Sequence, residues 1–274
     1  MELTKKITVN YTDISNVDAI NNDIIKLIVK MIPKHYNKMH ICVLCFLGGT
    51  DFIIDGKIGT IIHRNYTKII NDIIVKQQLF PIIFNGATNA GHINILNSVL
   101  DKHVNKYLSF GFTTGNYKKY DINATLIQNN HFNFTFGFDF GLSDFGIETK
   151  FLFGTIQQLL KIQKFKDIKV MYNFVNGGKI TAKEFFYAAM ISHNNSEYIL
   201  HKNTGRFTHG LISSIGKNNI VFDPSIENTP LKDKVIYDIS IGKNGTFTVG
   251  NNFDFDELNT SHLINIKRLN IVII

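Results

Sequence analysis

The chain has 274 residues, of which 44% are hydrophobic and 19% are charged, and its formal net charge is +7. This composition excludes an intrinsically disordered chain, and the length is sufficient for one large α/β domain with a buried core. The positive charge favours anionic partners, but the lysines lie in short pairs without the basic tract of a nucleic-acid surface, so nucleic acid is not an expected partner.

Targeting and metal-binding signals are absent from the sequence. No segment has the roughly 20 continuous apolar residues of a transmembrane helix, and the first residues, MELTKKITVNYTD, lack the apolar core of a signal peptide. We therefore expect a soluble, cytoplasmic protein without a membrane span. Cys42 and Cys45 form a C-x-x-C pair, but inside the apolar run HICVLCFLGG they would point to opposite faces of a buried strand. We expect no metal site and no resident cofactor.

Apolar runs alternate with amphipathic segments along the first 192 residues. After a first helix at 18–32, the expected strands are 40–47, 79–84, 106–112, 131–138 and 168–175. The expected helices between and after them are 64–78, 90–103, 146–163 and 181–192. Strands that alternate with helices predict an α/β fold, a Rossmann-like parallel sheet with helices on both faces.

The pattern changes near residue 193 to short alternating runs separated by Gly, Asn, Asp and Pro, with Asn244-Gly245 as a plausible tight turn. We therefore divide the chain into an N-terminal extension with a helix (1–37), a ligand-binding domain (38–192) and a β-rich C-terminal extension (193–274). The last segment is either a separate appendage or a set of strands added to the main sheet.

Glycine-rich turns follow several of the expected strands, and in a parallel sheet such turns converge on one crevice. Clustered backbone N–H groups in glycine turns suit a phosphate, although a single glycine there is equally well explained by turn geometry. None of the turns is a P-loop or a three-glycine dinucleotide fingerprint. The candidate ligand-binding residues in these turns are Gly48, Gly49, Thr50, Asp51, Gly86, Thr88, Asn89, Gly91, Thr113, Gly115, Gly177, Gly178, Lys179 and Thr181.

Four further residues are candidates outside the turns. Arg64 is the candidate for a phosphate contact, because the guanidinium group of an arginine can hydrogen-bond to two phosphate oxygens at once. His131 and Glu148 are candidate ligand contacts, with a structural histidine and a favourable helix N-terminus as the plainer explanations. Glu184 could act as a general acid or base, whereas a capping box with Thr181 explains it more simply.

The order of these motifs resembles the SLOG branch of Rossmann-like domains, and is most similar to the N-terminal cytosolic SLOG region of melastatin-type TRP channels. The likeness covers about residues 38 to 192. Its residues are Gly48, Gly49 and Phe52; Gly86, Thr88 and Gly91; Asn129, His131, Phe134, Asp139, Gly141, Gly146 and Glu148; and Gly177 and Gly178.

This resemblance implies a domain that binds or senses a nucleotide-derived signal such as ADP-ribose, without turnover. A sister branch cleaves nucleoside monophosphates with a PGG-x-GT-x-x-E motif, which Gly177, Gly178, Thr181 and Glu184 match in spacing. Asn176 and Ile180 depart from that motif, which weakens the catalytic alternative. A structural protein with a vestigial pocket is the third hypothesis. Self-association and an effector partner both stay open.

Five phenylalanines repeat with a period of two, at 132, 134, 136, 138 and 140. Such a row could stack against single-stranded nucleic acid. We interpret it instead as the core-facing side of a strand, because small or polar residues alternate with it.

Overall fold

The computed structural model of the chain describes residues 7–36, 40–48, 56–87, 91–114, 132–139, 148–165, 168–191, 194–214, 219–220, 239–241, 246–249, 264–265 and 269–274. Eight strands form one sheet in which every neighbouring pair is parallel, with the order β1-β5-β4-β3-β2-β6-β7-β12. The strands are β1 (Ile7–Tyr11), β2 (Ile41–Gly48), β3 (Phe80–Gly86), β4 (Leu108–Thr114), β5 (Phe134–Phe138), β6 (Lys169–Val175), β7 (Ser196–Leu200) and β12 (Asn270–Ile273). The predicted α/β class is confirmed.

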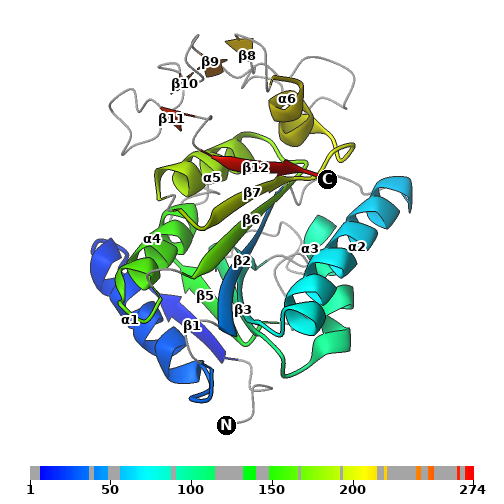
Figure 1. Cartoon of the computed structure of the whole chain (residues 1–274). Coiled ribbons are helices and arrows are strands. Elements are labelled where there is room, and N and C mark those ends of the chain that lie inside the picture. Colours follow the sequence, from blue (N-terminus) through cyan, green and yellow to red (C-terminus); the bar gives the residue numbers. More distant parts are fainter. Residues whose placement is uncertain are drawn as a thin grey trace.

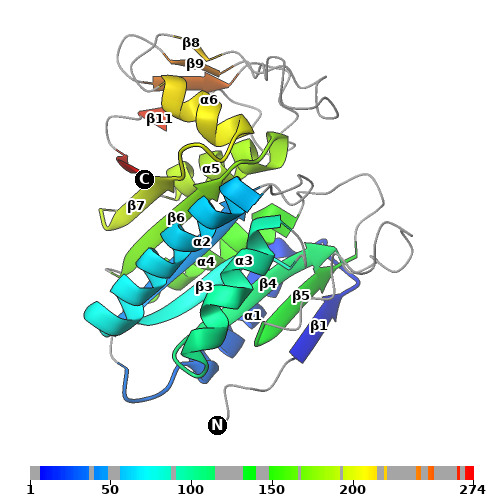
Figure 2. The same cartoon turned by 90° about the vertical axis from the view of Figure 1, so that its right-hand side faces the viewer.

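Helices cover both faces of this sheet (Figure 1). The first face carries α1 (Val17–Met31), α4 (Glu148–Lys161) and α5 (Lys179–Met190), and the second carries α2 (Gly56–Asn71) and α3 (Gly91–Leu100). Figure 2 shows α2 and α3 side by side on the second face. A π-helical turn (Asp72–Lys76) extends α2, and a 3-10 turn (Asp101–His103) extends α3.

Strand β2 shows why the central strands read as unbroken apolar runs. Its side chains alternate between two cores, so that Cys45 packs in the core of the first face and Cys42 in the core of the second. A parallel sheet covered on both sides needs apolar residues on each face. The two cysteines are both free and buried, and the prediction that they face opposite ways is confirmed.

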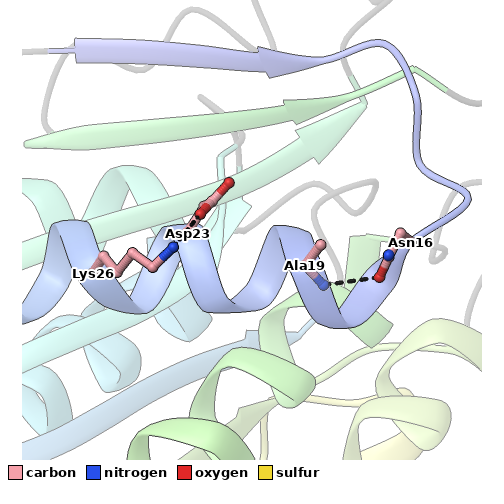
Figure 3. A network of polar contacts seen from close by, with 4 residues as sticks. All are labelled: Asn16, Ala19, Asp23 and Lys26. Carbon is pink, nitrogen blue, oxygen red and sulfur yellow. Dashed lines mark hydrogen bonds and ion pairs between the residues drawn. The ribbon is translucent and has the colours of Figure 1, made fainter.

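Helix α1 begins with a side-chain cap. The Asn16 side chain accepts a hydrogen bond from the backbone N–H of Ala19 at 3.0 Å, which satisfies one of the unpaired donors of the first turn (Figure 3). The exposed Asp23–Lys26 ion pair on the same helix contributes little, because both side chains are largely in water. The buried isoleucine stripe of α1 is what holds this helix on the sheet.

Three strands of the sheet were not expected from the sequence, namely β1, β7 and β12. Each of these strands is short, and it is recognised by its pairing with a neighbouring strand and not by its own sequence pattern. Strand β1, for instance, pairs with β5 from Ile7↔Phe134 to Tyr11↔Phe138. Helix α2 also begins eight residues earlier than expected, because tertiary packing overrides the weak helix propensity of Gly56 and Gly59.

The chain beyond residue 193 contributes to the main sheet and to a second one. Strands β7 and β12 lengthen the parallel sheet, and α6 (Arg206–Ser214) follows β7. The strands β8 (Asn219–Ile220), β9 (Ile239–Ile241), β10 (Thr246–Val249) and β11 (Ile264–Asn265) form a small antiparallel sheet. The turn expected at 244–245 lies outside the described residues.

The phenylalanine row is part of the core. Phe134, Phe136 and Phe138 are buried on the first face and stack against the phenylalanines of β4, with 5.7 Å between the ring centroids of Phe110 and Phe134. Phe132 precedes the strand and packs in a separate small cluster, and Phe140 lies outside the described residues. The interpretation of the row as a core face is confirmed for the three residues in β5.

Replacing Phe136 by alanine is expected to lower the free energy of unfolding by about 3–5 kcal/mol, because its ring is fully buried and the cavity cannot close. Urea unfolding followed by circular dichroism measures this loss. A change below about 1 kcal/mol would contradict the assignment of the ring to the core.

Candidate functional site

The sheet has one point at which the direction of chain progress reverses. From β2 the chain moves through β3 and β4 to β5, and it then returns to place β6 on the other side of β2. The loops after β2 and β6 therefore leave toward opposite faces, β2 leading to α2 and β6 to α5. Ligands of open α/β sheets bind beyond the carboxyl ends of the strands at such a reversal. Gly48 and Gly177 lie at this place.

Gly48 ends β2 and has a packing reason to be glycine. A Cβ atom there would collide with the backbone carbonyl oxygen of Val175 on β6, and would lie 3.1 Å from Nε2 of His92. The absence of a side chain lets the ends of β2 and β6 approach each other closely. The structure of the sheet alone is therefore sufficient to explain this glycine.

Gly177 follows β6 and is explained in a similar way. Its φ is +87° and that of Asn176 is +50°, so the chain turns through the left-handed region that glycine adopts most easily. A Cβ atom on Gly177 would also collide with the side chain of Thr181, which is buried in α5. Gly91, at the start of α3, has a φ of +55°.

Gly86, at the end of β3, is required neither by a steric collision nor by its backbone conformation. It does not have a positive φ, and no described atom lies within 4 Å of the position that its Cβ would take. The alternation along β3 points this position toward the first face, in the row of Phe80, Ile82 and Phe84. Within the described residues, Gly86 borders open space.

Two helices flank this open space. Helix α4 packs over β4, α5 packs over β2, and the two helices contact each other, so the end of β3 lies between the two strands that they cover. Glu148 is the first residue of α4, and Glu184 lies in the second turn of α5. The two helix starts and the end of β3 thus meet at the same edge of the sheet.

Glu184 is a buried acid. Burial, together with the neighbouring negative charge of Glu148, raises the pKa of Glu184 well above its usual value, so the protonated form of this carboxyl is favoured. Its Oε2 atom is buried and has no hydrogen-bond partner among the described residues. Burial and the proximity of Glu184 also raise the pKa of the Cys45 thiol.

The predicted capping box is wrong. Helix α5 begins at Lys179, two residues earlier than expected, with Gly178 as a cap that makes no side-chain hydrogen bond. Thr181 therefore lies inside the helix, and Glu184 lies too far along it to close a capping box. Helix capping therefore does not explain the glutamate at position 184.

A second buried group of polar side chains lies on the other face of the same edge. The hydroxyl oxygen of Tyr66 on α2 lies 2.8 Å from Nδ1 of His92 on α3, and the backbone of Gly48 also hydrogen-bonds to His92. Burial lowers the pKa of His92 to about 4, so the ring is neutral at physiological pH.

His201, which follows β7, continues this group. Its Nε2 lies 3.4 Å from Oδ1 of Asn173 and its Nδ1 lies 3.3 Å from Nδ2 of Asn65. Burial, with the nearby His92, lowers the pKa of His201 to about 3. Its carbonyl accepts a hydrogen bond from the Thr204 hydroxyl, which in turn accepts one from the backbone N–H of Asn176. The ends of β2 and β6 and the start of α3 are thereby linked through neutral side chains, because the ring of Tyr66 packs against that of His201.

The other predicted residues are placed as follows. Thr113 is buried near the end of β4, and Arg64 is exposed in the third turn of α2, away from the start of that helix. The backbones of Gly178 and Lys179 form the start of α5. The predicted residues Gly49, Thr50, Asp51, Thr88, Asn89, Gly115 and His131 lie outside the described residues.

Several residues of this edge were not predicted from the sequence. Asn85, Asn173 and His201 are fully buried, and neither amide atom of Asn85 has a hydrogen-bond partner among the described residues. The available signal was an asparagine inside an apolar strand, as in PIIFNG and VMYNFV. A polar amide at such a position requires a specific partner.

The described part of the chain contains no cluster of three or more His, Cys, Asp or Glu side chains suited to a metal ion. Among its helices, none combines the length and the apolar character that a membrane crossing requires.

Comparison with known proteins does not assign a family. No family model and no curated protein matches the sequence. Among solved structures, the chain is similar to chloroplast FtsY from Physcomitrella patens, with 13% identity and a TM-score of 0.28 over 68% of this chain. The match spans 58% of the FtsY chain, which is less than two thirds of its length.

The two buried histidines make stability depend on pH. Unfolded histidines titrate near pH 6.5, whereas folded His92 and His201 titrate near 4 and 3, so the unfolded chain takes up more protons as the pH falls below 6.5. We expect the free energy of unfolding to fall by roughly 2 kcal/mol for each histidine between pH 7 and pH 5. Urea unfolding at the two pH values measures this. A loss in His92→Gln equal to that of the wild type would exclude His92 as a source.

Proposed function

We propose that this protein binds a nucleotide-derived ligand of the ADP-ribose type at the carboxyl edge of its sheet, without turning it over. The observation that carries the proposal is Gly86, which borders open space among the described residues at the end of β3, the strand between those that α4 and α5 cover. A glycine that neither its backbone nor its described neighbours require is suited to close approach by a ligand.

The groups around this space fit the parts of such a ligand. Helix α5 begins at the strand reversal without a capping side chain, and helix N-termini favour phosphate through their unpaired N–H groups and their dipole. The raised pKa of Glu184 favours its protonated form, which does not repel an anion and can donate a hydrogen bond. Carboxyl groups commonly bind ribose hydroxyls, a role that fits Glu148 and Glu184. The net charge of +7 attracts anions from a distance.

Replacing Gly86 by alanine is expected to weaken binding by about tenfold or more, because an added methyl group in a closely packed contact costs about 1–3 kcal/mol. Isothermal titration calorimetry against ADP-ribose, NAD and AMP measures the affinity, and thermal melting measures the stability. The melting temperature of Gly86→Ala should stay near that of the wild type, since no described atom opposes the new methyl group.

Two other glycines serve as controls. Gly56→Ala places a methyl group in equally open surroundings but on the opposite face, and should keep the affinity. Gly48→Ala should lose stability, because its Cβ collides with the β6 backbone. Binding of none of the three ligands by the wild type, or unchanged affinity in Gly86→Ala, would overturn the proposal.

One observation favours a second candidate, a nucleoside monophosphate N-glycosidase. A buried Glu184 with a raised pKa beside Glu148 resembles the acid and base that hydrolysis of a glycosidic bond requires. The C1′–N bond would break as Glu184 gives its proton to the leaving base, while water adds to C1′ and loses its proton to Glu148. Binding remains the better-supported proposal because Arg64, whose side chain alone among the arginines is described, lies exposed on α2 and far from this pair.

Glu184→Gln separates the two candidates. If the protein only binds, neither the wild type nor the variant releases free base from nucleoside monophosphates. The variant should also be at least as stable as the wild type at pH 7, because a raised pKa means that ionising Glu184 destabilises the folded state as the pH rises above about 4.5. Base release by the wild type and its loss in Glu184→Gln would establish the glycosidase instead.

A further inference from the structure

The turn after β6 is hydrogen-bonded to the start of α6. The backbone N–H of Phe207 donates to the carbonyl oxygen of Gly177 at 2.9 Å, and that of Thr208 donates to the carbonyl oxygen of Asn176 at 3.3 Å. Both N–H groups belong to the first turn of α6, where the helix itself offers no carbonyl partner. The turn after β6 therefore satisfies two of the unpaired donors of α6.

The side chain of Thr204 makes a third bond to the same turn. Its hydroxyl oxygen lies 3.0 Å from the backbone nitrogen of Asn176 and 2.7 Å from the carbonyl oxygen of His201. An N–H only donates and a carbonyl only accepts, so the hydroxyl accepts from Asn176 and gives its own proton to His201. Thr204 and Asn176 are both buried, so water does not compete for these bonds. The end of β6 is thereby tied to the segment that follows β7.

These bonds fix the direction of two backbone N–H groups. In a trans peptide the C=O and the N–H point in opposite directions, and the described chain has no cis peptide bond. Because the carbonyls of Asn176 and Gly177 point toward α6, the N–H groups of the same two peptides, which belong to Gly177 and Gly178, point away from it. Neither N–H has a hydrogen-bond partner among the described residues, although Gly177 is buried. Buried N–H groups without a partner are rare, so these two are suited to an external acceptor.

The two glycine N–H groups directly precede the first turn of α5. Its cap, Gly178, makes no side-chain hydrogen bond, so the row of free donors continues into the helix. Successive N–H donors at a helix start suit the oxygens of a phosphate. The turn has a φ of +50° at Asn176, and a residue with a Cβ keeps this conformation only where its surroundings hold it. The bonds from residues 204–208 supply that restraint.

We propose that Thr204, together with the start of α6, is a positioning element that aims the N–H groups of Gly177 and Gly178 at the phosphate of the ligand. This inference rests on the proposed function. The Thr204 hydroxyl acts through the backbone of Asn176 and not by contact with the ligand. Without it, the left-handed turn loses one of its three restraints, and the peptides that follow lose their fixed direction. The segment after residue 193 thereby takes part in the site.

Three variants separate this role from a role in stability alone. Thr204→Val removes the hydroxyl and keeps the shape of the side chain, whereas Thr204→Ser keeps the hydroxyl. Thr155→Val is the matched control, because Thr155 is also fully buried and its hydroxyl donates to Oδ1 of Asn21 at 3.2 Å. That bond joins α4 to α1, away from the turn after β6. Both valine variants lose one buried hydrogen bond, so both should melt at a lower temperature than the wild type.

Affinity for ADP-ribose, measured by isothermal titration calorimetry, is the first readout. We expect Thr204→Val to weaken binding about five- to tenfold, which corresponds to the loss of one hydrogen bond. Thr204→Ser should restore most of the affinity, and Thr155→Val should bind as the wild type does. Unchanged affinity in Thr204→Val, or an equal loss in Thr155→Val, would refute the positioning role and leave the proposed function intact.

The amide resonances of Gly177 and Gly178 are the second readout, in ¹H–¹⁵N spectra of protein labelled with ¹⁵N-glycine. Both amide protons should move downfield when ADP-ribose is added to the wild type, because a hydrogen bond to a phosphate oxygen deshields them. Thr204→Val should reduce these shifts, and Thr155→Val should not. A wild type that binds ADP-ribose without moving either resonance contradicts the positioning role, even if Thr204→Val does not fold. A wild type that binds none of ADP-ribose, NAD and AMP overturns both the role and the proposed function.

Discussion

The close approach of the β2 and β6 backbones at Gly48 is the constraint on which this structure depends. The chain lays down β2 to β5 in one direction and then returns to the other side of β2, so these two strands end side by side while their helices depart to opposite faces. Any side chain at Gly48 would force the two ends apart. The two strand ends can lie close together at this reversal because this position carries no Cβ.

The two faces of the sheet handle buried polarity differently at this edge. On the first face, the pKa of the buried Glu184 is raised, and one of its oxygens has no hydrogen-bond partner among the described residues. On the second face, His92 and His201 are neutral, and their nitrogens are engaged by neighbouring side chains and by the Gly48 backbone. A hydrogen-bond network whose groups are all paired adds rigidity, whereas a buried carboxyl with an unpaired oxygen keeps a hydrogen-bonding group that a ligand can use. The rigid face supports the face that is open.

The sequence allowed the fold class and most of the central elements to be predicted, because strands buried on both faces are unbroken apolar runs and their helices are amphipathic. It was less informative at the edges. The pairing of β1 with β5, and of β12 with β7, is decided by partners that are distant in sequence, and no local pattern reveals it.

The start of α5 was misplaced because Thr181 and Glu184 imitate a capping box, while the true cap, Gly178, has no side chain to signal it. The roles of the glycines could not be separated either. Only three-dimensional neighbours distinguish Gly48 and Gly177, which packing requires, from Gly86, which it does not.

The pairing of β1 with β5 has a consequence for how the chain is made. As the chain leaves the ribosome, Ile7 to Tyr11 appear well before their partner strand, which does not exist until Phe138 has been added. Until then the segment is an alternating strand with unpaired backbone groups, which favours association with other chains. Helix α1 can form early, because its cap and its isoleucine stripe are local, but the outermost strand is completed only after translation has passed the middle of the sequence. Completion of this edge of the sheet therefore waits until β5 has been synthesised.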